Sequence, residues 1–312
     1  MVLSASRRTD IPAFYSEWFL NRIKEGFVCV QNPMNPKQIS KISLSPDVID
    51  CIVFWTKNPK PLFEKIDNLS DYKYYFQFTL NPYSQDIETN LPHKNKEIID
   101  TFKKLSDKIG KEKVIWRYDP ILLNEKYTVD YHIEYFGEIA TLLNGYTEKT
   151  TISFVDLYNK ISKNMEFVKN ITMTDNDKLK IAENFGKIAC ENNFVIDTCA
   201  EDIDLSQFGI KHALCIDNHL IERIIGSPLD ITKDKNQRLE CGCVASVDIG
   251  AYNSCSNGCL YCYANYSKEI VEKNRKNHNS LSPLLIGNVP ENAVMNDRKI
   301  TSCKKLQTKL FQ

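Results

Sequence analysis

Short β-rich runs alternate with helical patterns along almost the whole chain, and this alternation limits the fold more than any other feature. Eight runs read as strands: residues 2–5, 51–56, 74–79, 114–118, 151–155, 194–198, 213–216 and 244–249. Strands that alternate with helices form parallel sheets. The sequence therefore predicts an α/β fold, most simply a closed (β/α)8 barrel of the TIM type. An open doubly wound sheet is the alternative.

Apolar residues at helical spacing mark three of the intervening helices. One ends just before Gly110, and a second begins after Thr174, a suitable N-cap residue. A third is entered through Asp10 and Pro12 and ends near Gly26.

No Pro-, Gly- or Ser-rich linker and no internal repeat divides the chain. We therefore expect one α/β barrel domain over residues 1–280, which includes a cysteine-bearing loop at 241–265. The remaining residues, 281–312, are expected to form a C-terminal tail that packs on the barrel.

The composition is that of an ordinary globular protein. Of 312 residues, 42% are hydrophobic and 26% are charged, which excludes a disordered or low-complexity chain. Lys and Arg together number 40, as do Asp and Glu, so the formal net charge is zero. A chain without net charge has no overall attraction for nucleic acid or for an anionic membrane. No apolar run approaches about 18 residues and no signal peptide is present, so we expect a soluble, cytoplasmic protein.

Polar side chains collect where the predicted strands end. Lys57 and Arg117 extend near-continuous apolar runs, CIVFWTKNP and VIWRYDP, where a solvated loop charge is not expected. In a barrel these groups would meet at the face that carries the chemistry. Arginine and lysine would bind carboxylate or phosphate, although the arginines of SRRTD could equally form salt bridges, and Asp10 or Glu201 would bind an ammonium group. The candidate catalytic and substrate-contacting residues are Arg7, Arg8, Asp10, Lys57, Arg117, Asp119 and Glu201.

Eleven cysteines are the unusual feature of the composition. Their number is odd and the chain is not small, so a disulfide framework explains them poorly. Five of them fall within residues 241–262. Clustered reduced thiols in a cytosolic protein indicate a metal site.

Cys255, Cys259 and Cys262 follow a C-x3-C-x2-C pattern on a loop between a predicted strand and a predicted helix. Thiolates are the usual ligands of iron–sulfur clusters, so three of them can hold three irons of a [4Fe–4S] cluster. The fourth iron would stay open for another ligand. A closed zinc site that also uses Cys241 and Cys243 is the alternative.

The segment YNSCSNGCLYCYAN resembles the cysteine loop of the radical S-adenosylmethionine (SAM) superfamily, and its ending YCYAN resembles the spore-photoproduct-lyase-like members. The resemblance implies that the open iron binds SAM and that an electron from the cluster cleaves SAM to methionine and a 5′-deoxyadenosyl radical. It also makes Tyr261, as the aromatic residue near the adenine, and Asn253 candidate cofactor contacts.

The whole chain, from SRRTDIPAFYSEWF through VFWTKNP, IWRYDPI, SFVDLY and TCAE to the cysteine loop, resembles the bacterial and archaeal family called domain of unknown function 1848. In ordinary radical SAM proteins the cysteine loop lies near the N-terminus of the barrel, whereas here the βα unit that carries it comes after seven other predicted strands. We therefore expect a circularly permuted barrel in which the last strand neighbours residues 2–5. The glycine-rich turn that binds the SAM amino group in the ordinary order would be replaced by residues 4–10, which contain no glycine.

Four further cysteines predict a second iron–sulfur site: Cys199, Cys215, Cys241 and Cys243. Cys199 and Cys215 end neighbouring predicted strands, which lie about 4.8 Å apart in a parallel sheet. The segment before Cys243 must return over the same edge of the sheet for the four to meet. Two buried free thiols are the alternative for Cys199 and Cys215.

These patterns together predict an iron–sulfur enzyme that resembles radical SAM proteins. Its partners would be a small-molecule substrate and an electron donor such as ferredoxin or flavodoxin. An iron–sulfur protein that transfers electrons or binds a small molecule without cleaving SAM is the second interpretation. Repair or modification of nucleic acid is the third, and the zero net charge argues against it.

Overall fold

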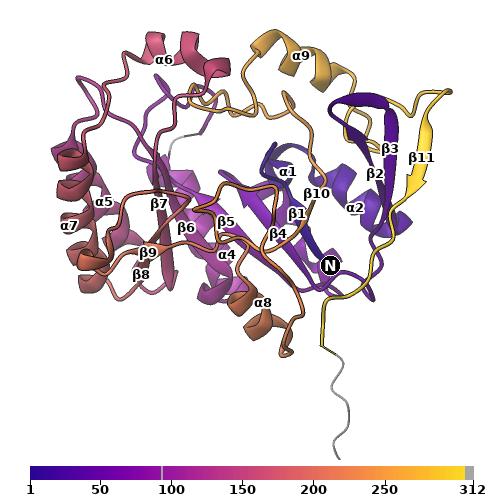
Figure 1. Cartoon of the computed structure of the whole chain (residues 1–312), viewed down its shortest axis with the longest axis horizontal. Helices are drawn as coiled ribbons and strands as arrows, with labels where there is room; N and C mark the ends of the chain where they lie inside the picture. The colour runs from indigo at the N-terminus through magenta and orange to yellow at the C-terminus, as the bar shows by residue number, and fades with distance from the viewer. Residues whose placement is uncertain (93, 306–312) are drawn as a thin grey trace, which may run out of the picture.

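The computed structural model describes residues 1–92 and 94–305, and its centre is an eight-stranded sheet in which all neighbouring strands are parallel (Figure 1). The strand order is β10-β1-β4-β5-β6-β7-β8-β9. The strands are β1 (Val2–Ala5), β4 (Cys51–Thr56), β5 (Tyr74–Thr79), β6 (Val114–Ile121), β7 (Lys149–Phe154), β8 (Val195–Thr198), β9 (Lys211–His212) and β10 (Val247–Asp248). This arrangement confirms the predicted α/β class with a parallel sheet.

Helices connect most of these strands, and α5 and α7 lie side by side against the same part of the sheet (Figure 1). The helices are α1 (Ile11–Phe14), α2 (Ser16–Glu25), α3 (Lys60–Phe63), α4 (Ile99–Ile109), α5 (Val129–Leu143), α6 (Ser162–Val168), α7 (Asp175–Glu191), α8 (Asn218–Ile225) and α9 (Lys268–Lys276). Single-turn helices lie at Ile66–Leu69, Lys94–Ile98, Lys111–Lys113, Asn159–Ile161 and Ser206–Phe208. No helix in the described part of the chain is long and apolar enough to cross a membrane.

The central strands are buried on both faces, as their continuous apolar runs predict. In β4, Ile52 and Phe54 belong to the large core between sheet and helices. Cys51 and Val53 point to the other face and pack in a second core that also contains Cys215. The residues after β9 therefore cover the second face of the sheet.

The predicted helix boundaries are confirmed. Gly110 follows α4 with φ +98°, a conformation that glycine adopts most readily. Thr174 caps α7, and its hydroxyl accepts the backbone N–H of Asp177 at 3.2 Å. Gly26 ends α2 in the left-handed conformation, whereas Asp10 caps the separate short helix α1.

The last two predicted strands are much shorter than expected. β9 lies at Lys211–His212 rather than 213–216, and β10 covers only Val247–Asp248 of the predicted 244–249. In the structure the carbonyl oxygen of Cys215 accepts a hydrogen bond from the Tyr75 hydroxyl at 2.9 Å instead of continuing a ladder. The apolar run at residues 213–216 therefore indicates burial and not a strand, because side chains can be buried without strand pairing of their backbone.

The prediction that the last strand neighbours the first is confirmed, because β10 pairs in parallel with β1 through Leu3 with Val247 and Ser4 with Asp248. β9 and β10 stand at the two ends of the strand order, and no pairing joins them in residues 1–92 and 94–305.

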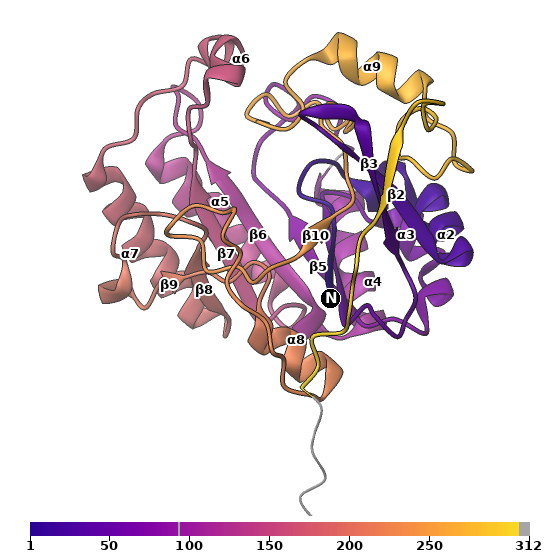
Figure 2. The ribbon, with the colours of Figure 1, turned by 45° about the vertical axis from the view of Figure 1, so that its right-hand side comes forward.

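A second, three-stranded sheet was not predicted. It contains β2 (Phe27–Asn32), β3 (Asn35–Ser43) and β11 (Val294–Asp297), which lie side by side at one edge of the molecule (Figure 2). β3 is mostly polar and exposed, so it lacks the apolar run that marks a strand. Of the predicted C-terminal tail, residues 281–305 include β11, and residues 306–312 lie outside the described residues.

Candidate metal centres

The loop that carries Cys255, Cys259 and Cys262 lies between β10 and α9. Asn265 fixes both ends of this loop. Its side-chain oxygen accepts the backbone N–H groups of Ser254 and Cys255, each at 2.8 Å. Its amide nitrogen donates to the Arg8 carbonyl at 3.0 Å and lies 3.5 Å from the Cys262 sulfur. The asparagine of YCYAN therefore has a direct structural role beside two of the three thiols.

The middle of the cysteine loop rests on residues 87–90, which precede α4. Leu260 donates its backbone N–H to the Ile87 carbonyl at 3.0 Å, and the Asn90 side chain donates to the Ser256 carbonyl at 2.8 Å. Gly258 has φ +68°, and a Cβ atom there would lie 2.1 Å from the Thr89 hydroxyl oxygen. A Cβ atom here would force the Thr89 side chain or the loop to move, and the positive φ favours glycine.

Burial sets the protonation of two of the three thiols. Burial raises the pKa of Cys255 well above its usual range. Burial also raises the pKa of Cys259 to about 12, and the nearby Lys57 ammonium only partly opposes this shift. Without a cation these two groups are therefore neutral thiols, whereas a metal would hold them as thiolates. Three thiolates fit the predicted cluster.

No group of three or more His, Cys, Asp or Glu side chains converges on one ion position in residues 1–92 and 94–305. A [4Fe–4S] cluster does not require such convergence, since each thiolate binds a different iron.

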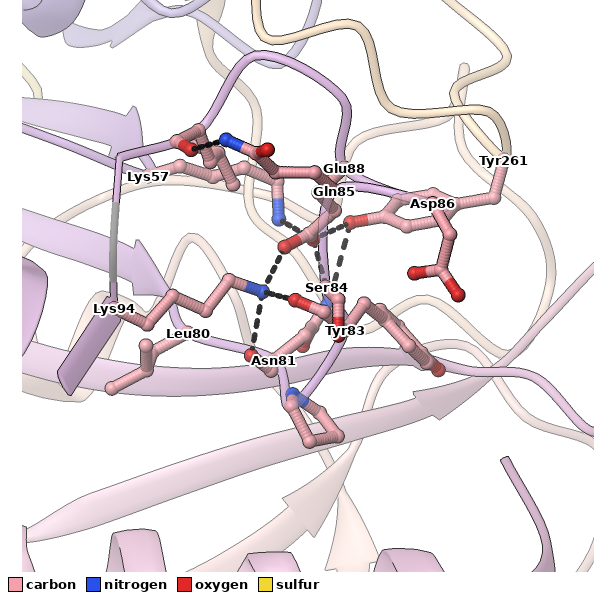
Figure 3. Close-up of polar contacts among 12 residues, drawn as sticks. Lys57, Leu80, Asn81, Tyr83, Ser84, Gln85, Asp86, Glu88, Lys94 and Tyr261 are labelled. Atoms are coloured by element: carbon pink, nitrogen blue, oxygen red, sulfur yellow. Dashed lines mark hydrogen bonds and ion pairs between the residues drawn. The ribbon is translucent and has the colours of Figure 1, made fainter. Parts of the chain in front are cut away.

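A buried charge network lies directly under the cysteine loop (Figure 3). Glu88 accepts Lys57 Nζ at 2.7 Å and also forms an ion pair with Lys94. The Tyr261 hydroxyl donates to the same carboxylate, and the Asn81 amide donates to that hydroxyl at 3.1 Å. Although burial alone would raise the pKa of Glu88, the two lysines lower it to about 2. The network keeps one excess positive charge next to Cys259.

The second set of cysteines comes together in the structure. The sulfur atoms of Cys199 and Cys215 lie 3.2 Å apart, and Cys241 and Cys243 lie close enough to influence one another's pKa, which for Cys241 is lowered to about 7. The backbone N–H of Ile216 donates to the Cys243 sulfur at 3.3 Å. Four thiols contributed by three separate segments thus form one group, which we call the four-cysteine group.

The chain before Cys241 returns over the sheet edge as this group requires. Arg238 pairs with Asp156, which follows β7, at 2.6 Å. Val244 then donates its backbone N–H to the Ile216 carbonyl at 3.1 Å. These contacts hold residues 238–244 beside the C-terminal ends of β7 and β8.

Two arginines face the four-cysteine group. Arg117 Nη1 lies 3.0 Å from the Cys215 sulfur, and its guanidinium pairs with Asp119. The guanidinium groups of Arg7 and Arg117 lie 5.3 and 5.1 Å from the Trp55 ring centre. Burial alone would lower the pKa of Arg7, but Cys243 and the other nearby thiols raise it. The Arg7 Nη2 atom is buried without a hydrogen-bond acceptor in the described residues, so thiolates in this group would supply a missing counter-charge.

Comparison with known proteins gives the family of the chain. The model of the family described as Domain of unknown function (DUF1848) matches residues 2–264, which contain both sets of cysteines. The chain belongs to the DUF1848 family. No curated protein matches its sequence significantly. Among solved structures, one from Bacteroides thetaiotaomicron VPI-5482, described as an alpha-L-fucosidase, covers 75% of this chain and 85% of its own at 13% identity. Its TM-score of 0.26 is too low to carry an argument.

Several predicted contact residues have structural roles in this DUF1848 protein. The Asp10 carboxylate accepts the backbone N–H groups of Ala13 and Lys57 at 3.0 and 2.8 Å, and the Asn257 amide at 3.1 Å. Asn253 accepts the backbone N–H groups that precede α9, from Tyr266 at 3.0 Å. The structure uses both side chains to join loops.

The remaining predicted residues lie around the two cysteine sets. The Arg8 guanidinium lies 5.0 Å from the Tyr252 ring centre, near Asp248. Glu201 lies after β8 and accepts the backbone N–H of Phe154 at 2.9 Å. Its burial raises its pKa to about 7.

Sequence reasoning missed two members of the buried network, Glu88 and Lys94, whereas Asn81 belongs to the polar side chains that collect where the predicted strands end. Glu88 lies in a loop between β5 and α4 and Lys94 begins the single-turn helix Lys94–Ile98, and hydrophobic periodicity gives no signal at either position. No local charge pattern marks these positions either. Only the fold brings these side chains under the cysteine loop.

Proposed function

We propose that this DUF1848 protein is an iron–sulfur enzyme that resembles radical SAM proteins and acts on a small-molecule substrate. Cys255, Cys259 and Cys262 would hold a [4Fe–4S] cluster with one open iron. The observation that carries the proposal is the position of these thiols on a βα loop, with Asn265 bound to the loop at both ends. The chemistry that such a cluster supplies, when bound, is reductive cleavage of SAM to methionine and a 5′-deoxyadenosyl radical.

We further propose that the sheet is a circularly permuted barrel of the radical SAM type. The pairing of β10 with β1 supports this, because it places the last βα unit beside the first strand. Residues 213–216 follow β9 and residues 241–244 precede β10, and side chains of both segments share one core with Cys51 and Val53. They would close the barrel without forming full-length strands.

The residues of this chain would bind and orient the reactants. The Lys57–Glu88–Lys94 network would keep positive charge beside Cys259, which favours the thiolate form. Tyr261, held by Glu88, would pack beside the adenine of SAM. Arg7, Arg8 and the Arg117–Asp119 pair would contact SAM or substrate, with the guanidinium groups binding carboxylate or phosphate. An electron donor such as ferredoxin or flavodoxin would supply the reducing electron.

The four-cysteine group would hold a second iron–sulfur cluster. Its sulfur atoms accept N–H groups from Arg117 and Ile216, the pattern expected around thiolates that carry negative charge. Arg7 would balance part of that charge.

An iron–sulfur protein that transfers electrons without cleaving SAM is the second candidate. It is favoured by three of the hydrogen bonds that Asp248 accepts. Asp248 accepts the hydroxyls of Ser4 and Ser6, at 3.1 and 2.6 Å, and the backbone N–H of Arg7 at 2.9 Å. These internal bonds occupy the segment that would have to bind the SAM amino group.

The first experiment is metal analysis of anaerobically purified protein. We expect about four iron and four sulfide from the cysteine loop, lost in a Cys255/Cys259/Cys262 triple serine variant. Cys190→Ser is the matched control, because Cys190 is an exposed cysteine on α7. Stoichiometric zinc without sulfide would contradict the cluster.

The second experiment separates the two functions. After reduction with dithionite, SAM should yield 5′-deoxyadenosine and change the EPR spectrum of the loop cluster. A reduced cluster that gives neither result would favour the electron-transfer protein.

A further inference from the structure

Two segments beside the cysteine loop expose apolar side chains, and we call them together the rim surface. The first, residues 157–171, contains α6, and the second, residues 263–276, ends with α9. Both helices lie at the same end of the molecule (Figure 1 and Figure 2). Seven of the fourteen exposed large hydrophobic side chains in the described part of the chain belong to the rim surface, and Phe167 is 77% exposed. Exposed apolar groups that gather in this way mark an interaction surface.

The two segments of the rim surface contact each other next to the cysteine loop. The ring centres of Tyr158 and Tyr263 lie 5.4 Å apart. The Lys160 ammonium lies 5.8 Å from the ring centre of Tyr252 and 5.4 Å from that of Tyr266, the residues that flank the loop on its two sides. The rim surface is therefore continuous across the loop.

The rim surface also carries an excess of positive charge. Its two segments contain seven Lys and Arg residues but only three Glu and no Asp, although the whole chain has no net charge. Lys163 on α6 and Lys268 and Lys273 on α9 are exposed. A surface with this excess is complementary to a partner that presents acidic side chains.

The position of the rim surface relative to the thiols favours a redox partner. Cys255 and Cys262 are partly exposed, and Tyr263 of the rim surface directly follows Cys262. A protein bound on the rim surface would therefore come close to the loop cluster. An anionic membrane also attracts basic and aromatic side chains, but it would make no use of the neighbouring thiols.

We propose that the rim surface is the docking site of the electron donor of the loop cluster, a small redox protein with an acidic surface. The inference rests on the proposed function, because it places the partner that reduces the same cluster. In the docked complex one electron passes from the donor to the cluster. The donor is oxidised by one electron, the cluster is reduced by one electron, and no bond or proton is exchanged. The lysines would steer the donor, and exposed apolar groups such as Phe167 would supply contact area.

The first test measures binding of an acidic ferredoxin and an acidic flavodoxin, in separate titrations of anaerobically purified protein. We expect at least one of the two donors to bind, and the affinity should fall by about tenfold or more as NaCl rises from roughly 50 to 300 mM. The triple variant Lys163→Glu/Lys268→Glu/Lys273→Glu should weaken binding at low salt by about tenfold or more, because it reverses the charge of three exposed lysines of the rim surface.

The matched control is Lys73→Glu/Lys104→Glu/Lys111→Glu, which reverses three exposed lysines elsewhere on the molecule. Lys73 and Lys111 precede β5 and β6, so they lie at the opposite end of the parallel sheet from the cysteine loop. This variant has the same net charge as the rim variant and should bind the donor like the wild type. Phe167→Ser tests the apolar contact without a change of charge, and we expect it to weaken binding by about fivefold.

The second test measures electron transfer. The reduced donor should reduce the loop cluster of the rim variant at least about tenfold more slowly than that of the wild type, as followed by EPR. Dithionite is a small reductant that needs no docking surface, so it should reduce both clusters alike. Failure of both donors to bind the wild type, or equal affinity for the wild type and the rim variant, would overturn the inference. Binding to vesicles of phosphatidylcholine and phosphatidylserine without binding to either donor would also overturn it, in favour of a membrane surface.

SAM cleavage on the same samples separates this inference from the proposed function. A wild-type cluster that the donor reduces but that yields no 5′-deoxyadenosine from SAM would contradict the proposed function and leave the docking site in place. A protein that cleaves SAM after reduction with dithionite but neither binds nor accepts electrons from the two donors would contradict only the docking site.

Discussion

At the scale of single residues, the most informative groups are charges that the fold buries. Glu88 is 1% exposed and lies between two lysines and a tyrosine hydroxyl. Two cations and one carboxylate leave an excess positive charge beside Cys259, and such a charge stabilises thiolates. The network is therefore expected to contribute to the stability of the fold and to the charge next to Cys259.

Replacement of Glu88 by Gln should destabilise the protein by about 3 kcal/mol, because it leaves two buried lysines without a counter-charge. Glu183→Gln is the matched control, since Glu183 pairs with Lys187 on the exposed face of α7 and should cost less than about 1 kcal/mol. Urea unfolding at pH 7 measures both values. Equal stability of the two variants would contradict the buried network.

The same carboxylate predicts an acid-sensitive stability. The folded pKa of Glu88 is lowered to about 2 from an ordinary value of 4.5. Its contribution is therefore complete above pH 4.5 and is lost as the pH falls from about 4.5 towards 2. The unfolding free energy of the wild type should fall more steeply over this range than that of Glu88→Gln. Parallel pH profiles would show that Glu88 is not held as a carboxylate.

At the scale of elements, the cysteine loop depends on a close approach between two segments. We expect Gly258→Ala to lose most of the iron of this loop, because a Cβ atom would lie 2.1 Å from Thr89 and the φ of +68° is strained for alanine. Gly145→Ala has a similar φ of +86° with no atom within 4 Å, so it should keep its iron. Iron analysis and EPR of the two variants separate the effect of the close contact at Gly258 from the effect of a strained positive φ. Normal iron content in Gly258→Ala would show that the loop tolerates displacement.

The sequence allowed prediction of the central strands and of the cysteine loop, but not of every element that positions them. Strands such as β4 and β5 carry continuous apolar runs, which are typical of elements that are buried on both faces. Their bounds were predicted correctly. β3 has a polar, exposed pattern and is fixed by pairing with β2 and β11 rather than by burial. The return of residues 238–244 over the sheet edge involves long-range contacts such as that of Arg238 with Asp156, which have no local signal in the sequence.

At the scale of the whole molecule, β10 and β1 join the last βα unit to the first strand. The region from 213 to 246 joins the two ends of the sheet with α8 as its main regular element. Tyr75 and Gln77 donate to the Cys215 carbonyl at 2.9 and 2.8 Å, and the four-cysteine group lies in the same region. A metal bound there would therefore stabilise a region that has few ladder hydrogen bonds.

Removal of metal from the four-cysteine group should loosen this region before the rest of the sheet. In the Cys255/Cys259/Cys262 triple serine variant, the four-cysteine group would hold the remaining cluster. A chelator under reducing, anaerobic conditions should then increase amide hydrogen exchange in residues 213–217 and 238–244, because thiols without metal no longer join these segments. Exchange in β4 and β5 should change little, and the unfolding midpoint should fall by roughly 5–10 °C. Cys241→Ala with Cys243→Ala in the same background is the control, and the chelator should have no effect on it. Iron loss that leaves exchange in both segments unchanged would show that the four-cysteine group does not hold the metal.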